Sequence, residues 1–279
     1  MKIHAIQTGE VQIKTRQVEA RRESRPARIL DTLRDREWTS WVPILCWAIE
    51  HPEGIVMVDS GESSRAGKHG YQPGWDLYGR FAVRFSVTPE QESGPQLKAL
   101  GLDPADVRWV VMTHMHGDHA GGLSHFPSSE IVMSEREAAA ALARTGPLNG
   151  YHNKHYPQWL APRRVAFDSG PWESFDASSV LTADGAVRIV PTPGHTNGHL
   201  SVAVEDGGEI VLLAGDTTYL ERTLLSGAVD GVCDDARAHR ESTERLRELC
   251  RRRSVVYLPT HDPESAARLA ARTATAVPA

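Results

Sequence analysis

One short stretch decides how this sequence is interpreted: Thr113-His114-Met115-His116-Gly117-Asp118-His119. It places three imidazoles and a carboxylate within six positions, directly after the apolar run 107–112. Imidazole nitrogen and carboxylate oxygen are donors that zinc-class ions take in proteins. In an extended segment the first two histidines point to the same side, so they can hold one ion while the aspartate and the last histidine turn towards a second. A lone histidine would be explained as a hydrogen-bonding polar residue, but four ligand-type residues at this spacing favour a metal site.

Three further apolar runs each end in a residue of ligand type. Residues 190–195 end at His195, residues 211–216 end at Asp216, and residues 255–261 end at His261. Active-site residues commonly gather at strand ends and in the loops that follow them. Each of these runs alone is weak evidence. Together with the first motif they supply enough ligands for two ions that share one carboxylate.

These pieces, HxHxDH at 114–119, PTPGHTNGH at 191–199, AGD at 214–216 and PTH at 259–261, resemble the metallo-β-lactamase superfamily of dinuclear hydrolases. The resemblance runs from about Trp47 to His261. It implies an α+β fold, an αβ/βα sandwich of two central mixed β-sheets flanked by helices, formed as a single domain over residues 1–279. The expected order of strands and helices fits this architecture better than a strictly alternating parallel sheet.

The resemblance also implies how the ligands are shared. One ion would be held by three imidazoles, those of His114, His116 and His195. The other would be held by Asp118, His119 and His261, with Asp216 bridging both. Asp59 sits where the superfamily places a carboxylate that orients a ligand histidine, whereas His199 has a structural part. Mixed histidine and aspartate ligands suit two zinc ions, and also iron, cobalt or manganese.

Two details indicate the branch of the superfamily. The segment 41–61, WVPILCWAIEHPEGIVMVDSG, is similar to that of the quorum-quenching N-acyl-homoserine lactonases. Asp216-Thr217-Thr218-Tyr219 matches their Asp-x-x-Tyr pattern, in which the tyrosine contacts the substrate carbonyl. The alternative for Tyr219 is an ordinary packed aromatic. Glyoxalase II-like enzymes fit less well, because they reach the first histidine motif much sooner.

The expected reaction is the opening of a lactone ring, that of an N-acyl-homoserine lactone, by a metal-bridging hydroxide. Tyr219 would stabilise the oxyanion together with a metal, and Asp118 would shuttle the proton. Asp216, the bridging ligand, is the third residue expected to act in catalysis. Two alternatives stay open: a hydrolase of another lactone or ester, such as a pyridoxolactone-type ring, and a non-catalytic binding protein. All seven candidate metal ligands are present in the sequence, which disfavours the non-catalytic binding protein.

The composition is that of an ordinary soluble globular protein: 279 residues, 40% hydrophobic, 24% charged, with a formal net charge of −5. The basic clusters at 21–28 and 251–253 are balanced by acids nearby and predict solvated helix faces, so no nucleic-acid partner is expected. Three widely spaced cysteines do not make a disulfide framework, and Cys46 is expected to be buried.

No stretch is long enough for a membrane span, and the first residues do not resemble a signal peptide, so a cytoplasmic protein without a membrane partner is expected. The partner implied is a small-molecule lactone, and the resemblance is compatible with a homodimer.

The apolar pattern predicts strands at 1–15, 107–112, 187–190, 200–204, 210–213 and 255–258, a hairpin of 42–49 with 55–58, and helices at 88–99, 134–144, 234–252 and from 264. The stretch 16–37 is expected to be loop or short helix, and the tail is expected to fray from Thr273. Two aromatic-rich loops, 62–86 and 150–162, would wall an acyl-chain pocket, or pack on the body or on a second copy. The wall residues would be Trp75, Tyr78, Phe81, Phe85, Tyr151, Tyr156 and Trp159. His125, His152, His155 and His239 are not expected to be ligands.

Overall fold

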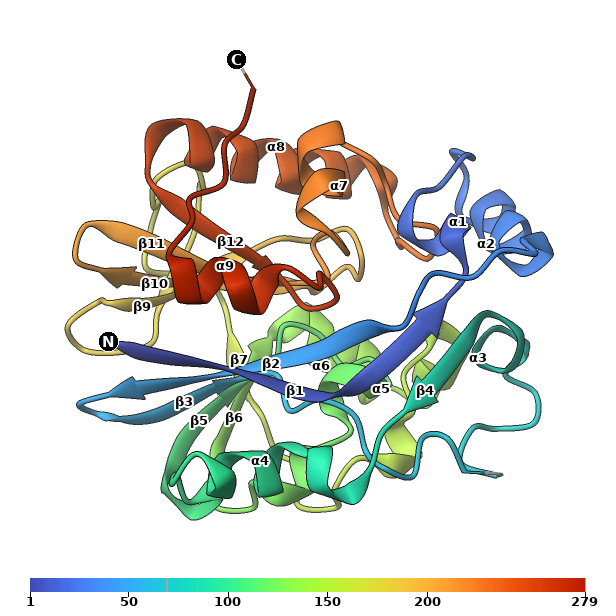
Figure 1. Cartoon of the computed structure of the whole chain (residues 1–279), viewed down its shortest axis with the longest axis horizontal. Helices are drawn as coiled ribbons and strands as arrows, with labels where there is room; N and C mark the ends of the chain where they lie inside the picture. The colour runs from blue at the N-terminus through green and yellow to red at the C-terminus, as the bar shows by residue number, and fades with distance from the viewer. Residues whose placement is uncertain (69, 279) are drawn as a thin grey trace. The chain divides into compact units, whose positions relative to one another are not determined.

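The computed structural model describes residues 1–68 and 70–278, and these divide into two compact units (Figure 1). The first unit consists of residues 1–14 and 36–164. The second consists of residues 15–35 and the chain from Val165 onwards. Whether the two units behave as the single domain expected from the sequence stays a prediction.

The first unit is built on a seven-stranded sheet with the order β4-β1-β2-β3-β5-β6-β7. The strands are β1 (Lys2–Ile13), β2 (Val42–His51), β3 (Gly54–Val58), β4 (Val83–Ser86), β5 (Val107–Val111), β6 (Glu130–Ser134) and β7 (Arg163–Val165). Strands β1, β2 and β3 pair antiparallel, whereas β3, β5 and β6 pair parallel. Its helices are α3 (Leu77–Ala82), α4 (Ser93–Ala99), α5 (Gly117–Ala120) and α6 (Glu135–Ala141), and its 3-10 turns are Pro89–Gln91, Pro104–Asp106, Leu123–His125, Gly146–Asn149 and Asn153–His155.

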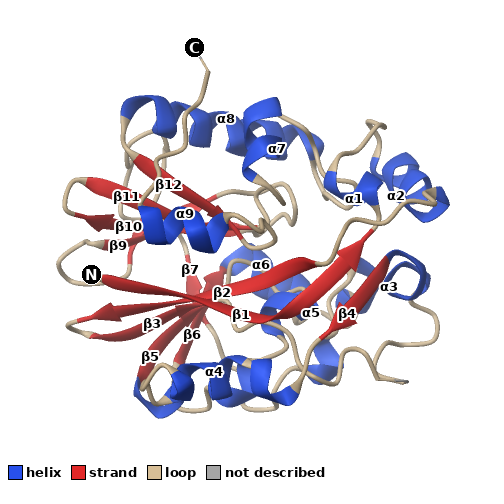
Figure 2. Cartoon of the chain, in the orientation of Figure 1, coloured by secondary structure: helices blue, strands red, loops and turns tan. Residues whose placement is uncertain are grey.

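The second unit has a five-stranded sheet with the order β12-β11-β10-β9-β8, of which Figure 2 labels β9 to β12. Its strands are β8 (Ser179–Val180), β9 (Val187–Pro191), β10 (Leu200–Asp206), β11 (Glu209–Gly215) and β12 (Val255–Pro259). Its helices are α1 (Thr15–Val18), α2 (Arg25–Arg34), α7 (Glu221–Ser226), α8 (Ala236–Arg252) and α9 (Ser265–Ala271). Only the β11–β12 pair is parallel among the pairings described, so both sheets are mixed, as predicted.

Each unit has its own apolar core, which fixes the strand ends that carry the predicted ligands. In the first, Met57, Val110 and Phe126 are fully buried in one cluster. In the second, Leu212 and Tyr257 belong to another. Burying large side chains of this kind contributes about 1.5–3 kcal/mol each. The runs that lead to the ligands are therefore core strands with little freedom to move.

Most predicted elements are present, with shifted boundaries. The hairpin of β2 and β3 is confirmed, with His51 opposite Gly54. The helix predicted over 88–99 is wrong in its first half, where a 3-10 turn precedes an α-helix that begins only at Ser93. The break lies at Glu92, whose backbone is extended and whose carboxylate accepts a hydrogen bond from the Ser64 amide at 2.8 Å. Strand β6 and helix α3 were not predicted.

The tail is predicted to be frayed from Thr273 onwards. This prediction is wrong for the segment up to Thr275. That residue is 4% exposed, and its backbone N–H donates to the Val255 carbonyl at 2.8 Å. Thr275 Oγ1 also donates to the Glu221 carboxylate. The tail is therefore tied to the end of the second sheet by hydrogen bonds that its sequence does not reveal.

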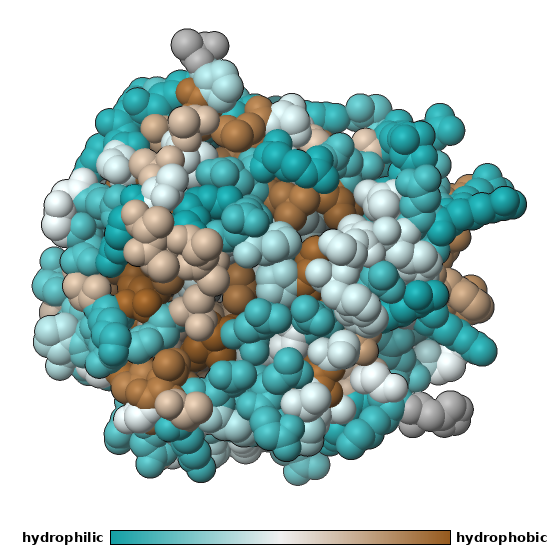
Figure 3. Space-filling model, in the orientation of Figure 1, coloured by the Kyte–Doolittle hydropathy of each residue, from teal (hydrophilic) through white to brown (hydrophobic). Residues whose placement is uncertain are grey.

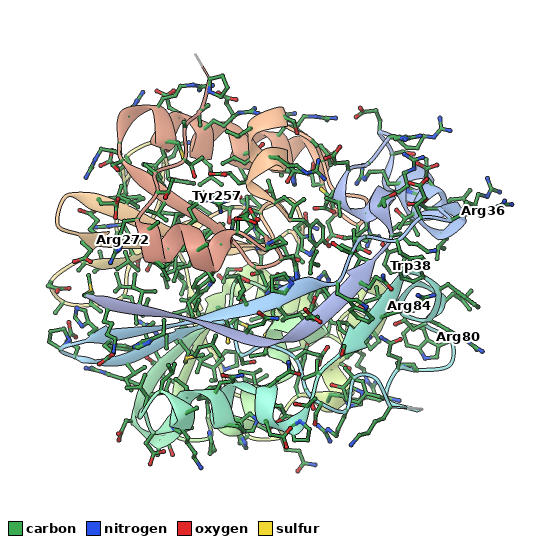
Figure 4. All side chains as sticks on the ribbon, in the orientation of Figure 1. Arg36, Trp38, Arg80, Arg84, Tyr257 and Arg272 are labelled. Atoms are coloured by element: carbon green, nitrogen blue, oxygen red, sulfur yellow. The ribbon has the colours of Figure 1, made fainter. Side chains whose placement is uncertain are left out.

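Members of both basic clusters are ion-paired, but the prediction of a solvated face is wrong at Arg28, which is 2% exposed and donates to the carbonyl oxygens of Glu23 and Cys233. Arg25 pairs with Asp234 at 3.0 Å and Arg252 with Glu248 at 2.6 Å. In the sticks of Figure 4, Arg272 projects from the end of α9, where it pairs with Asp206 at 3.0 Å. Hydrophilic residues cover most of the face drawn in Figure 3. Among the described residues, none of the helices combines the length and the apolar character that crossing a bilayer requires.

Candidate metal centre

The first motif gathers four donors at the end of β5. His114 and His116 have ring centroids 4.6 Å apart, and His114 and His119 have theirs 4.0 Å apart. His119 Nε2 lies 4.0 Å from Asp118 Oδ1. The short helix α5 begins directly after His116. This change from strand to helix turns Asp118 and His119 back towards the rings of His114 and His116. The sequence therefore folds here into one cluster of imidazoles and a carboxylate.

Asp59 holds this cluster from the end of β3. Its backbone is in the left-handed region, with φ 59°, and its carboxylate is 1% exposed. Oδ1 accepts from the Thr113 N–H and Oδ2 from the Thr113 hydroxyl, both at 2.8 Å. Oδ2 also lies 2.8 Å from His119 Nδ1, so the proton of that ring sits on Nδ1 and Nε2 is left as the donor atom for a metal.

The peptide between His114 and His116 has two further partners that the sequence did not reveal. The Met115 N–H donates to Glu137 Oε1 at 2.8 Å, and the Tyr156 hydroxyl donates to the Met115 carbonyl. Glu137 is fully buried in the first turn of α6, where Ser134 caps the helix. Nothing in the pattern of residues 134–144 distinguished this carboxylate from an ordinary helix-surface acid.

In the second unit Asp216 lies between two histidines. Its Oδ2 is 3.6 Å from His195 Nε2, and its Oδ1 is 3.4 Å from His261 Nε2. The Asp216 N–H donates to His199 Nε2 at 3.0 Å, and His199 Nδ1 contacts Thr192 Oγ1 at 2.9 Å. His199 thus positions the backbone of Asp216, in keeping with the structural part expected for it.

Asp230 is a functional candidate that the sequence did not reveal. Its Oδ2 lies 3.2 Å from His195 Nδ1, and its Oδ1 accepts from the backbone N–H groups of Val232 and Cys233. Burial would raise the pKa of this carboxyl, but His195, His239 and the Val232 amide hold it below the ordinary value. Asp230 therefore orients His195 as Asp59 orients His119.

Replacing Asp230 with asparagine should lower the affinity for zinc about 10- to 100-fold, because the ring of His195 loses its carboxylate partner. Competition with a chromogenic chelator measures that affinity. The matched control is Asp262→Asn, which changes a buried aspartate that accepts from the Glu264 N–H just before α9 and contacts Arg268. An Asp230→Asn protein that binds zinc as tightly as this control would refute the orienting role.

Tyr219 follows β11 and lies beside His195 and His261 of the second unit. Its ring centroid is 5.9 Å from that of His195 and 5.5 Å from that of His261. Its hydroxyl accepts a hydrogen bond from Gln17 Nε2 at 2.8 Å. The tyrosine is 4% exposed. It is thus held with its hydroxyl at a fixed point, a placement suited to a hydrogen-bond donor.

Glu62 lies against the helix turn that carries the first motif. A Cβ placed on Gly121 would come within 2.4 Å of its Oε1 and within 2.6 Å of the backbone N of Ser63, so this close approach requires glycine. The carboxyl accepts from the Ser63 N–H at 2.7 Å and is 1% exposed. Burial, followed by the charge of Asp118, raises its pKa to about 8.

The raised pKa of Glu62 predicts a pH-dependent stability. In chelator-treated protein its contribution is fully present below pH 4.5 and is lost as the pH rises through about 8. The free energy of unfolding should fall by a few kcal/mol over that window. Urea denaturation at several pH values measures it, and Glu62→Gln should remove most of the slope. An unchanged slope in that variant would show that other groups cause it.

The two aromatic loops are partly packed and partly exposed. Tyr151 is 2% exposed, with its ring centroid 5.4 Å from that of His116, and Tyr71 stacks on His155 at 4.0 Å. Trp75, Phe81 and Trp159 are 53%, 54% and 41% exposed. In a second cluster the ring of Trp38 lies close to Arg84, as Figure 4 shows, and Lys14 Nζ and Arg84 Cζ are each 3.9 Å from its centroid. The acyl-pocket assignment stays a prediction, while packing accounts for Tyr151.

The fold and these donors define a class: a protein of two mixed sheets whose strand ends carry histidine and aspartate side chains suited to binding metal ions. The family model described as the metallo-beta-lactamase superfamily matches residues 39–261. The chain belongs to this superfamily.

Several relatives carry names. A probable metallo-hydrolase of Mycobacterium tuberculosis is 30% identical over 80% of this chain and 76% of its own length. The N-acyl homoserine lactonase AttM of Azorhizobium caulinodans is 29% identical over 80% of this chain and 83% of its own. A solved N-acyl homoserine lactone hydrolase, with the product N-hexanoyl-L-homoserine bound, has a TM-score of 0.75 at 23% identity, over 94% of each chain. These comparisons confirm the predicted fold and the predicted relation to the lactonases.

Proposed function

We propose that this protein is a metal-dependent hydrolase that opens lactone rings, with N-acyl-homoserine lactones as its substrates. The observation that carries the proposal is the full donor set: His114, His116, Asp118 and His119 in one unit, and His195, Asp216 and His261 in the other. The names of the relatives support the substrate class, because the AttM proteins are N-acyl homoserine lactonases.

The donors suit two divalent ions, zinc in the first place, with iron, cobalt or manganese as alternatives. We assign His114, His116 and His195 to one ion, Asp118, His119 and His261 to the other, and Asp216 to both. The fit rests on the chemistry of the donors. Asp59 and Asp230 each accept a hydrogen bond from the Nδ1–H of a histidine, which leaves Nε2 as the donor atom for an ion.

When bound, the ions supply Lewis acidity and lower the pKa of a water molecule. The residues of the chain do the rest. Tyr219, held by Gln17, donates from its hydroxyl to the oxygen that becomes negative when the lactone carbonyl is attacked. Asp118 takes the proton of the attacking water and delivers it to the ring oxygen that leaves. The product is an open hydroxy acid, and no covalent intermediate with the protein is required.

A hydrolase of another lactone or of an ester is the second candidate, since the same donors serve those reactions. The cytoplasm as location and a homodimer as assembly belong to the proposal as well, and rest on the sequence alone.

Acid release from zinc-loaded protein and N-hexanoyl-homoserine lactone tests the function. We expect metal-dependent turnover that is lost in His116→Ala and kept in His125→Ala, a histidine that pairs with Glu92 at 2.7 Å instead. No turnover from protein that holds two ions per chain would refute this substrate and direct the search to other lactones and esters.

A further inference from the structure

The loop after the turn Gly146–Asn149 runs along the first metal motif within the first unit. A Cβ on Gly150 would lie 3.2 Å from His116 Nε2. Two residues later, His152 Nδ1 lies 3.7 Å from the point where a Cβ on Gly117 would stand. Gly117 separates His116 from Asp118 and has no side chain of its own. His152 Nδ1 therefore lies at van der Waals distance from the side-chain position at the centre of the motif.

Asp76 holds this histidine in a defined orientation. Asp76 caps α3, where its Oδ1 accepts from the Gly79 N–H at 2.8 Å, and its Oδ2 lies 3.4 Å from His152 Nε2. A carboxylate only accepts hydrogen bonds, so the ring donates from Nε2 and the neutral tautomer carries a lone pair on Nδ1. No residue in the described part of the chain forms a hydrogen bond with that Nδ1 atom.

We propose that His152 Nδ1 binds the amide N–H of N-acyl-homoserine lactones and so selects lactones that carry an amide beside the ring. This rests on the proposed function. The donors of the motif lie next to Gly117, and an amide attached to the ring carbon next to the reacting carbonyl is the group that reaches this position. An aliphatic lactone offers no hydrogen there, and a site built to bond an N–H discriminates against ligands that lack it.

The neighbouring groups do not provide this acceptor. Glu62 Oε2 lies 3.1 Å from the same point over Gly117, but the residue is only 1% exposed, whereas His152 is partly exposed. His155 is on the same loop, yet its Nε2 is bonded to the Tyr71 carbonyl at 2.9 Å and its ring stacks on Tyr71. The side chain of His152 keeps 13% of its surface exposed.

The test compares two substrates of one shape: N-hexanoyl-homoserine lactone and α-hexanoyloxy-γ-butyrolactone, in which an ester oxygen replaces the amide N–H. Mass spectrometry of the products separates ring opening from cleavage of the ester. Zinc-loaded wild-type protein should prefer the amide by about 10- to 100-fold in kcat/KM. His152→Ala should lose most of this preference, largely through KM, while His152→Gln, which retains an acceptor oxygen, should recover part of it.

His155→Ala is the control for disturbance of the loop and should keep the preference. The proposal is overturned if His152→Ala retains the wild-type preference, or if His155→Ala loses it to the same degree. Wild-type protein that opens both lactones equally well refutes the role of His152 and leaves the lactonase standing. Wild-type protein that opens neither refutes the proposed function itself.

Discussion

Replacing Asp216 with alanine is expected to lower kcat/KM for the lactone by at least about 1,000-fold, a loss of about 4 kcal/mol in transition-state stabilisation. The carboxylate lies 3.6 Å from His195 Nε2 and 3.4 Å from His261 Nε2, and it is the one donor assigned to both ions. Without it the two imidazoles lose the group between them. Steady-state kinetics of zinc-loaded protein, with the zinc content of the same sample, measure the effect.

The matched control is again Asp262→Asn, at the position that follows His261 in sequence. Asp262 is 5% exposed and accepts a hydrogen bond from the Glu221 N–H at 2.9 Å, so it serves the packing of α7 and α9. That variant should lose stability and keep both its zinc and its kcat. Full activity in Asp216→Ala would contradict the assignment, as would a loss of the same size in the control.

Asp59→Ala is expected to lower the free energy of unfolding by about 3–5 kcal/mol and the affinity for zinc about 10- to 100-fold. Removing this buried carboxylate leaves the Thr113 N–H, the Thr113 hydroxyl and the His119 ring N–H without their acceptor. Each buried donor that loses its acceptor costs about 1–3 kcal/mol. Urea denaturation of metal-free protein and a zinc competition titration measure the two effects separately.

The variant Asp59→Asn separates the effect of the negative charge of the Asp59 side chain from the effect of its shape. Asparagine tolerates the positive φ of 59° at this position and keeps one acceptor oxygen. We expect Asp59→Asn to lower the free energy of unfolding less than Asp59→Ala does. Its affinity for zinc should fall nearly as far as in Asp59→Ala. An Asp59→Ala protein within about 1 kcal/mol of the wild type would mean that the hydrogen bonds to Thr113 contribute little.

The candidate donors can be recognised in the sequence because each follows an apolar run of core residues. Val111, Leu213 and Leu258 are buried strand residues, and the ligands come shortly after them. Periodicity and residue type are enough to detect such a pattern. The two mixed sheets could be predicted from the same apolar runs together with the family resemblance.

The groups that support the donors could not be predicted in the same way. Asp230, Glu137 and Glu62 lie on turns or helices remote in sequence from the residues that they touch. An isolated acid in a loop has no periodic context that separates it from a solvated one. The same holds for His152, a lone loop histidine that is not expected to be a ligand, and only its position beside Gly117 gives it a role.

The most direct test of the account is the metal content of the protein measured by inductively coupled plasma mass spectrometry after zinc loading and dialysis. Asp118 and His119 belong to one unit and His261 to the other, yet we assign all three to the same ion. We expect about two ions per chain in the wild type and about one in His261→Ala. A wild-type protein that holds one ion or none, or an unchanged content in that variant, would contradict the dinuclear centre on which the proposed hydrolysis depends.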